Sequence, residues 1–150
     1  MNQWAITVGI NQYHRFQPLS YAQRDAQALR TFLVDEAGFA VDRCLLLTDS
    51  SPTVFGKSTY PTLENLQSWI DTLGQRYLQR DDVLWFFFSG YGICHEGQDY
   101  VVPIDAQPDS IATTAIPLRS IYQRLRTIPT KTVLVLLDMN RSEGTLSNET

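Results

Sequence analysis

Two short polar stretches, each directly after an apolar run, could carry the chemistry of this chain. Ser89-Gly90-Tyr91-Gly92 follows the run Asp82–Phe88, and Asp138-Met139-Asn140 follows Thr132–Leu137, so that Tyr91 and Asn140 stand 49 positions apart. The glycines predict a turn that presents Tyr91 at the end of a strand. Ligands of open α/β sheets bind beyond the carboxyl ends of the strands, so we expect both stretches to meet at one site.

The surrounding pattern supplies the elements that must position this site. Apolar runs predict strands over Trp4–Ile10, Cys44–Thr48, 82–88 and 132–137, with a short extended piece at Asp99–Pro103. Helical spacing predicts helices over Tyr21–Glu36 with a stop at Gly38, after an N-cap at Thr62, and over Pro117–Leu125 with Pro117 as the first helical residue. Strands that alternate with helices predict one α/β domain, residues 1–150, with a mainly parallel sheet covered on both faces.

The sequence ends soon after the last predicted strand, which would leave a hydrophobic sheet edge open. Natural proteins cover such edges, because unpaired strand groups invite association with other chains. We therefore expect a longer chain, with fused C-terminal domains, or a second chain that covers this edge. Residues 145–150 are polar and predict a loop or disordered tail.

Composition limits the classes of partner. The net charge is −4 and no basic run is present, which argues against nucleic acid and anionic membranes. No window approaches the roughly 18 consecutive apolar residues of a membrane span, and Met1–Trp4 does not begin a signal peptide. Cys44 and Cys94 lack metal-ligand spacing. We expect a cytoplasmic protein without a cofactor.

Further motifs run through most of the chain in a fixed order. They are WAITVGINQY, LSYAQRDAQALRTFL, EAGF with LLLTDSSPT, and GQDYVVPIDA, and together with the two polar stretches they span residues 4 to 144. This ordered set resembles the large catalytic subunit of the caspase–metacaspase clan (peptidase C14), and most closely the bacterial orthocaspases. The resemblance implies a caspase-like three-layer αβα sandwich, of the large-subunit (p20) type, without the C-terminal strands of the small subunit.

Two positions depart from the family pattern, in which a strand ends in Ser-Gly-His-Gly and another, about 50 residues later, ends in Asp-Ala-Cys. Tyr91 stands where the resemblance implies the catalytic His, and Asn140 where it implies the nucleophilic Cys. A carboxamide forms no nucleophilic anion near neutral pH, whereas a thiolate does. A phenol with a pKa of ~10 is a poor base compared with an imidazole of pKa ~6.5. The pattern predicts a catalytically inactive domain in which Tyr91 and Asn140 hydrogen-bond each other.

Other family features are retained. The resemblance implies that Asp25 and Asp138 line a pocket for a basic side chain of the substrate, and paired carboxylates suit a guanidinium or ammonium group. The alternative is that Asp138 caps turn amides and Asp25 favours the first turn of its helix. The N–H groups of Gly92 and Asn140 match the oxyanion-hole donors of the family. Asp105 matches a calcium-binding position, but the acidic pair expected further on is replaced, so we expect no metal.

Three interpretations stay open at this point. The favoured one is an inactive caspase-like domain with a regulatory or scaffold role, which binds peptides or proteins that contain Arg or Lys. The second is an active cysteine-type endopeptidase that cleaves after basic residues. Its remaining candidates, the adjacent pair Cys94-His95 and the flanking Ser89 and Ser142, are better interpreted as loop and turn residues. The third is a purely structural interaction module. Peptide binding and turnover separate the three.

Overall fold

The computed structural model describes residues 2–130 and 132–141. Its strands are β1 (Gln3–Gly9), β2 (Cys44–Thr48), β3 (Val83–His95), β4 (Gln98–Val101), β5 (Ile116–Pro117) and β6 (Thr132–Arg141). Its helices are α1 (Ala22–Asp35), α2 (Leu63–Thr72), α3 (Ile111–Thr114) and α4 (Leu118–Arg126), with short 3₁₀ segments at Val41–Arg43 and Pro108–Ser110 and a π-helical segment at Leu73–Tyr77. The predicted tail 145–150 and Ser142 lie outside the described residues.

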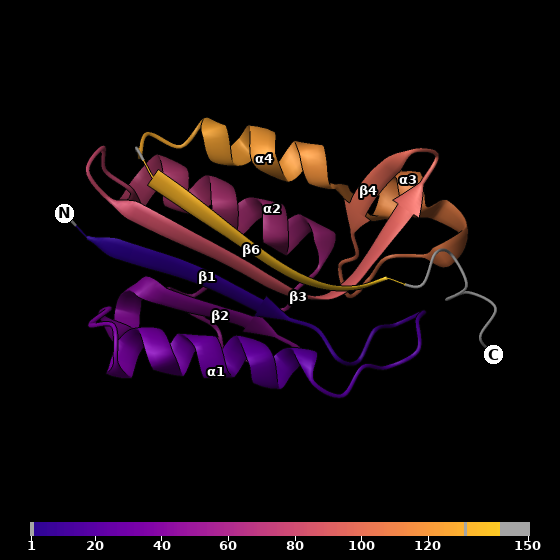
Figure 1. Ribbon diagram of the computed structural model, residues 1–150, viewed down its shortest axis with the longest axis horizontal. Helices are drawn as coiled ribbons and strands as arrows, with labels where there is room; N and C mark the ends of the chain where they lie inside the picture. Colours follow the sequence, from indigo (N-terminus) through magenta and orange to yellow (C-terminus); the bar gives the residue numbers. More distant parts are fainter. Residues whose placement is uncertain (1, 131, 142–150) are drawn as a thin grey trace.

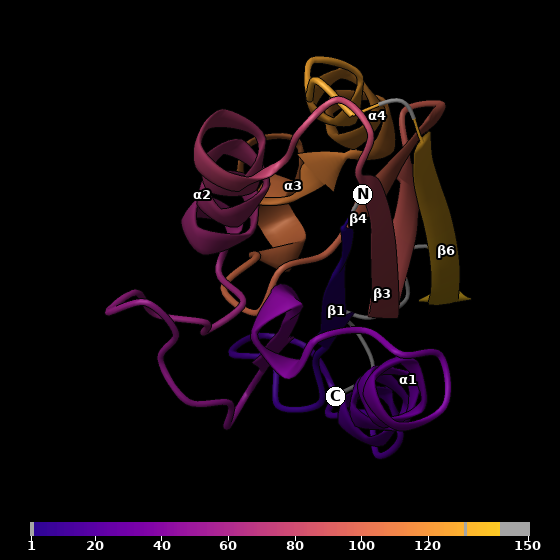
Figure 2. The same ribbon diagram turned by 90° about the vertical axis from the view of Figure 1, so that its left-hand side faces the viewer.

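The six strands form one mixed sheet in the order β2-β1-β3-β4-β5, with β6 paired to β3 as well. The pairs β1–β2, β1–β3 and β3–β6 are parallel, and the pairs β3–β4 and β4–β5 are antiparallel. Helix α1 covers one face, and α2 and α4 cover the other, which gives three layers (Figures 1 and 2). The predicted α/β fold with a mainly parallel, helix-flanked sheet is confirmed.

The main core lies between the sheet and the helices α2 and α4. It contains the apolar residues of β1 and β3 that point to this face, including Ile6, Val8, Leu84 and Phe88, together with the fully buried Trp69 of α2. A smaller core under α1 joins Ala5, Leu33, Phe39 and Cys44. Because both faces of the central strands are covered, these strands are apolar at successive positions rather than at alternate ones.

The predicted helix boundaries hold with small shifts. Thr62 accepts a hydrogen bond from the Asn65 amide and so caps α2 as expected. Helix α1 ends before Gly38, whose φ of +82° fits the left-handed residue that commonly follows a helix. Pro117 precedes α4 rather than opening it, because it pairs with Tyr100 in the short strand β5. None of the described helices is both long and apolar enough to cross a bilayer.

Strand β6 is the outermost strand beside β3, and β3 is its one neighbour among the described residues (Figure 2). Its exposure alternates along the chain, and Leu134 and Leu136 are 40% and 39% exposed. These two leucines pair in register with Trp85 and Phe87 of β3. The apolar face on the α1 side of the sheet therefore continues beyond the area that α1 covers.

Candidate functional site

The candidate site lies where β3 and β6 run side by side toward their carboxyl ends (Figure 1). The register pairs Ser89 with Asp138 and Tyr91 with Asn140. Leu134 and Leu136 mark the α1 side of β6, and Asp138 and Asn140 follow them at intervals of two. The register thus brings the two polar stretches together, as the sequence indicated, with Asp138 and Asn140 on the same side of the sheet as α1.

The predicted turn at residues 89–92 is wrong, because β3 continues without interruption to His95. The chain reverses at Glu96 and Gly97 instead, where both residues have positive φ, and β4 then pairs back on β3. The glycines serve close packing rather than a turn. A Cβ on Gly90 would lie 2.5 Å from the Tyr13 hydroxyl, and one on Gly92 would lie 2.5 Å from Met139 Sδ.

Tyr91 is enclosed by the loop that follows β1. Only 4% of it is exposed, and its ring lies 5.0 Å from that of Tyr13 and 5.7 Å from that of Phe16. Its hydroxyl donates a hydrogen bond to the Gln17 carbonyl (3.0 Å), and its amide donates to the Tyr13 hydroxyl (2.9 Å). Within the described part of the chain, the structure contains no hydrogen bond between the side chains of Tyr91 and Asn140, although the sequence predicted one. The Tyr91 side chain is therefore buried against this loop and hydrogen-bonded to it.

Burial also favours the protonated form of both phenols. It raises the pKa of Tyr91 above its ordinary value, with a smaller contribution from Tyr21, and it raises the pKa of Tyr13 as well. Both hydroxyls are therefore protonated at neutral pH. A phenol that keeps its proton and donates it to a carbonyl cannot take a proton from a nucleophile.

A network of backbone contacts holds this loop in place. The carboxylate of Asp49 accepts hydrogen bonds from the amides of Asn11 (3.0 Å) and Gln12 (2.6 Å). Asn11 in turn accepts bonds from the amides of Leu19 and Gln23, and so links both ends of the loop to the start of α1. The sequence marked this segment only as a loop, and its aromatic residues at positions 13 and 16 were the signal that it packs inward.

The acidic candidates lie at the same end of the sheet. Asp25 is half-buried in the first turn of α1, and Asp138 is exposed on β6. Gly9 lets α1 approach closely, since a Cβ there would lie 2.3 Å from the carbonyl oxygen of Ala22. Neither carboxylate forms an ion pair with a cation of the described residues. Both therefore keep the capacity to accept a cationic group.

The oxyanion-hole candidates are part of the sheet. Gly92 pairs in register with Arg141, and Asn140 pairs with Tyr91, inside the ladder that joins β3 to β6. The amide and the carbonyl of Tyr91 bond to Tyr13 and Val102, which turns the peptide groups of Gly92 toward β6. A donor role of these two amides toward a ligand stays a prediction.

Ser89 has an unusual environment for a hydroxyl group. It is fully buried, and its Oγ has no hydrogen-bond partner among the described residues, although turn hydrogen bonding was expected of it. Buried hydroxyls are normally paired, because loss of hydration without a partner is unfavourable. Ser89 lies in register with Asp138, so the unpaired hydroxyl belongs to the residue of β3 that is paired with this acidic candidate.

The cysteines lie away from this arrangement. Cys94 is exposed on β3, and its neighbour His95 lies 3.7 Å from the Glu96 carboxylate. Successive strand residues point to opposite faces, so Cys94 and His95 do not form a catalytic pair. Cys44 is buried on β2, and burial raises the pKa of its thiol to about 11, which keeps it protonated. Asp105, the calcium candidate, accepts a hydrogen bond from the Leu63 amide at the start of α2.

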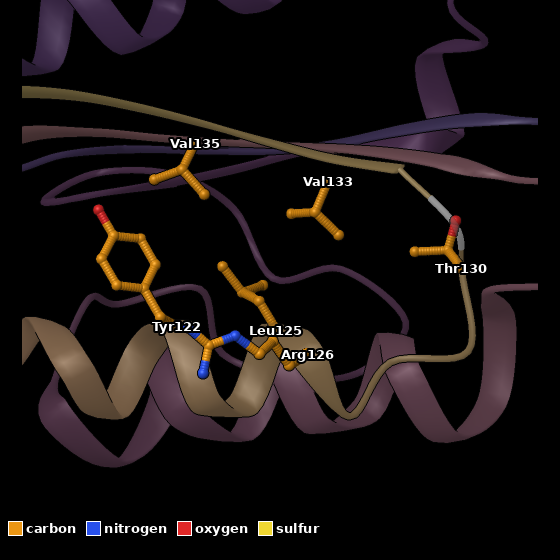
Figure 3. Close-up of a pocket in the computed structure, with 6 residues that line it drawn as sticks. All are labelled: Tyr122, Leu125, Arg126, Thr130, Val133 and Val135. Atoms are coloured by element: carbon orange, nitrogen blue, oxygen red, sulfur yellow. The ribbon is translucent and has the colours of Figure 1, made fainter.

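A hollow of about 390 Å³ lies on the opposite face, between α4 and β6. Figure 3 shows Tyr122 and Leu125 of α4 directed toward Val133 and Val135 of β6, while Arg126 runs along the helix at the edge of the hollow. Val133 and Val135 alternate with the residues that face α1, so this hollow is separated from Asp138 and Asn140 by the sheet itself. None of the predicted site residues lines it.

A family model described as the caspase domain matches residues 2–150, and the chain belongs to this family. It is 28% identical over 153 residues to a probable protease from a Desulfuromonadales bacterium, which covers 95% of this chain. It is 30% identical over 88 residues, 59% of this chain, to metacaspase-3 of Arabidopsis thaliana.

The solved structures agree on the fold. The crystal structure of protein GSU0716 from Geobacter sulfurreducens matches 95% of this chain and 52% of its own chain, with a TM-score of 0.70 at 16% sequence identity. The chain spans only 18% of the length of the bacterial relative and 23% of that of the plant relative. Activity, substrates and partners of this chain are therefore matters for proposal and test.

Proposed function

We propose that this caspase-family domain is catalytically silent and acts as a regulatory or scaffold module that binds Arg- or Lys-containing segments. The observation that carries the proposal is the pairing of Tyr91 with Asn140 where the family resemblance implies the His–Cys pair. One residue is a buried phenol whose proton is donated to the Gln17 carbonyl, and the other is an amide. Neither can supply the base or the nucleophile of peptide hydrolysis.

The binding half of the proposal is supported by the groups that remain. Asp25 and Asp138 lie at the same end of the sheet without an ion pair to a described cation, and the buried Ser89 hydroxyl lacks a partner beside them. Carboxylates form charge-assisted hydrogen bonds with guanidinium and ammonium groups. A basic side chain that enters between α1 and β6 would satisfy them.

Peptide cleavage tests the catalytic half. The wild-type protein and the double variant Tyr91→His, Asn140→Cys are compared on peptides with Arg, Lys or Asp before the scissile bond, in the longest available form of the chain. We expect no turnover by the wild type, since loss of one member of a nucleophile–base pair alone lowers rates by about 10⁴–10⁶. Turnover by the wild type that persists after purification from contaminating proteases would establish an endopeptidase and overturn the proposal.

Peptide binding tests the other half and separates it from a purely structural module. Fluorescence anisotropy with a labelled Arg-containing peptide should show saturable binding that weakens at least about tenfold in Asp138→Asn and in Asp25→Asn. Asp35→Asn is a matched control, because Asp35 is an exposed acid at the far end of α1. Binding that is absent, or equally weakened by the control variant, would leave a structural role as the better description.

A further inference from the structure

A second pocket, remote from the candidate site, combines three departures from ordinary local structure. It has a volume of about 360 Å³ and is formed by the loop before α2 and by the C-terminal end of α2. Phe55, Lys57, Arg76 and Tyr77 line it, over Trp69. The loop that carries Phe55 extends outward beside α2 (Figure 2). A volume of this order suits a small molecule.

The first departure is the conformation of Phe55. It occupies the tip of a tight turn between Val54 and Lys57, with a φ of +54°, and its side chain is 53% exposed. Left-handed backbone is unfavourable for a bulky residue by roughly 1–2 kcal/mol. A bulky side chain held in such a conformation and largely exposed is an outlier of the kind that clusters at ligand sites. The ring is stacked on that of Tyr77, with centroids 5.4 Å apart.

The second departure is the π-helical segment Leu73–Tyr77, which continues α2 by one wider turn. Such segments are rare and frequently occur at functional sites. Here the segment places Arg76 and Tyr77 at the rim of the pocket. Tyr77 also contacts the ring of Trp4, which anchors the wall to the start of β1.

The third departure is charge without a counter-ion. The Lys57 ammonium donates to the hydroxyls of Ser68 and Thr72 and lies 4.8 Å above the Trp69 ring, so two of its three protons bond to neutral groups. Burial and the nearby Arg76 lower the pKa of Lys57, while Asp71 opposes this shift. Asp71 already pairs with Arg124. Among the described residues, neither Lys57 nor Arg76 has a carboxylate within ion-pair distance.

Together, these three features fit an anionic ligand that carries a planar ring. An anion between Lys57 and Arg76 would remove the repulsion between the two cations, and Lys57 offers its third proton to it. A flat ring attached to the anion could lie on the exposed face of Phe55, since stacking on aromatic side chains is favourable for every planar base. We propose that this pocket binds a small organic anion that carries a planar ring, of the nucleoside monophosphate class.

The pocket and the candidate site are at opposite ends of the sheet. Tyr77 contacts Trp4, which pairs with Leu84 at the start of β3, whereas Tyr91 lies seven residues further on, about 23 Å of strand. Binding at the pocket therefore involves none of the predicted site residues near Asp138. It can be measured with the wild-type protein whether or not the proposed function holds.

Titration with adenosine monophosphate, monitored by calorimetry at low salt, tests the proposal. We expect saturable binding at least tenfold tighter than that of adenosine or inorganic phosphate alone. The affinity for phenyl phosphate should fall between that for adenosine monophosphate and that for inorganic phosphate if the ring rather than the sugar supplies the contact. Binding should weaken at least tenfold in Arg76→Gln and in Lys57→Met, and also in Phe55→Gly, which suits the left-handed turn.

Arg80→Gln is the matched control, because Arg80 is an exposed arginine outside the pocket. A loss in this variant equal to that in Arg76→Gln would show unspecific attraction by positive charge and overturn the proposal. Binding of adenosine monophosphate no tighter than that of inorganic phosphate would also overturn it, because the ring would then make no contact. Arg76 is exposed, so Arg76→Gln keeps the test valid even if Lys57→Met unfolds.

Discussion

Two aromatic sites at opposite ends of one sheet show contrasting uses of the same side chains. Around Tyr91, three rings are buried against each other, and the amide and the hydroxyl of the tyrosine are bonded to the loop after β1. Around Phe55, the ring is exposed, the backbone is left-handed, and the two cations nearby have no acidic partner among the described residues. The first arrangement stabilises the fold, and the second leaves interactions for a ligand.

The contrast predicts different responses to mutation, and the largest is expected at Tyr91. Tyr91→Ala removes a buried ring and should lower the free energy of unfolding by about 3–5 kcal/mol, as for other buried aromatic residues. Urea denaturation measures this loss. Phe32→Ala serves as the control, because Phe32 is 53% exposed on α1 and should change stability by no more than about 0.5 kcal/mol. Equal effects of the two variants would contradict the assignment of Tyr91 to the core.

The next effect tests the close packing of β3 against the loop. Gly90→Ala places a Cβ on the Tyr13 hydroxyl and should destabilise the protein by about 1–3 kcal/mol. The same clash predicts a non-additive pair. Gly90→Ala combined with Tyr13→Phe should be no less stable than Gly90→Ala alone, since the second change removes the obstructing oxygen. Additive losses in denaturation experiments would show that Gly90 is required for another reason.

A smaller effect, with a defined pH dependence, is expected for Tyr91→Phe. Loss of the hydrogen bond to Gln17 should lower stability by about 1 kcal/mol at pH 7. The folded state raises the pKa of Tyr91, so the hydroxyl stabilises the fold below its ordinary pKa of ~10, and this contribution is lost as pH rises above that value. Thermal unfolding of the wild type and the variant should therefore converge above pH 10. A constant difference would exclude this linkage.

The smallest effect on stability is expected at the second site. Phe55→Gly relieves the left-handed strain but loses the ring contact with Tyr77, and each is worth roughly 1 kcal/mol, so the net change should stay within about 0.5 kcal/mol. Denaturation midpoints measure it. A large loss of stability would place Phe55 with Tyr91 as a structural residue and would weaken the contrast between the two regions.

The sequence predicted the helices and strands, because apolar runs, Thr62 as N-cap and Gly38 as a stop act over short ranges. The meeting of the two strand ends followed from the parallel arrangement of these strands. The sequence-based prediction was wrong where one residue type occurs in two structural roles, as glycine does in turns and at close contacts. Gly90 and Gly92 suggested a turn, whereas they admit Tyr13 and Met139 against a continuous strand, and only tertiary contacts distinguish these roles. The partner of Tyr91 was likewise unpredictable, since Gln17 offers a backbone carbonyl that any residue would offer.

Strand β3 also has a consequence for how the chain folds. It pairs with three strands, and its pairs with β1 and β6 join residues as distant as Gln3 and Val83, or Val83 and Thr132. The hairpin with β4 instead starts from His95 and Gln98, around a two-residue turn. Local hairpins form within microseconds, while parallel pairs must first close long loops. We expect the β3–β4 hairpin to form early and to present β3 as the template on which β1 and β6 assemble.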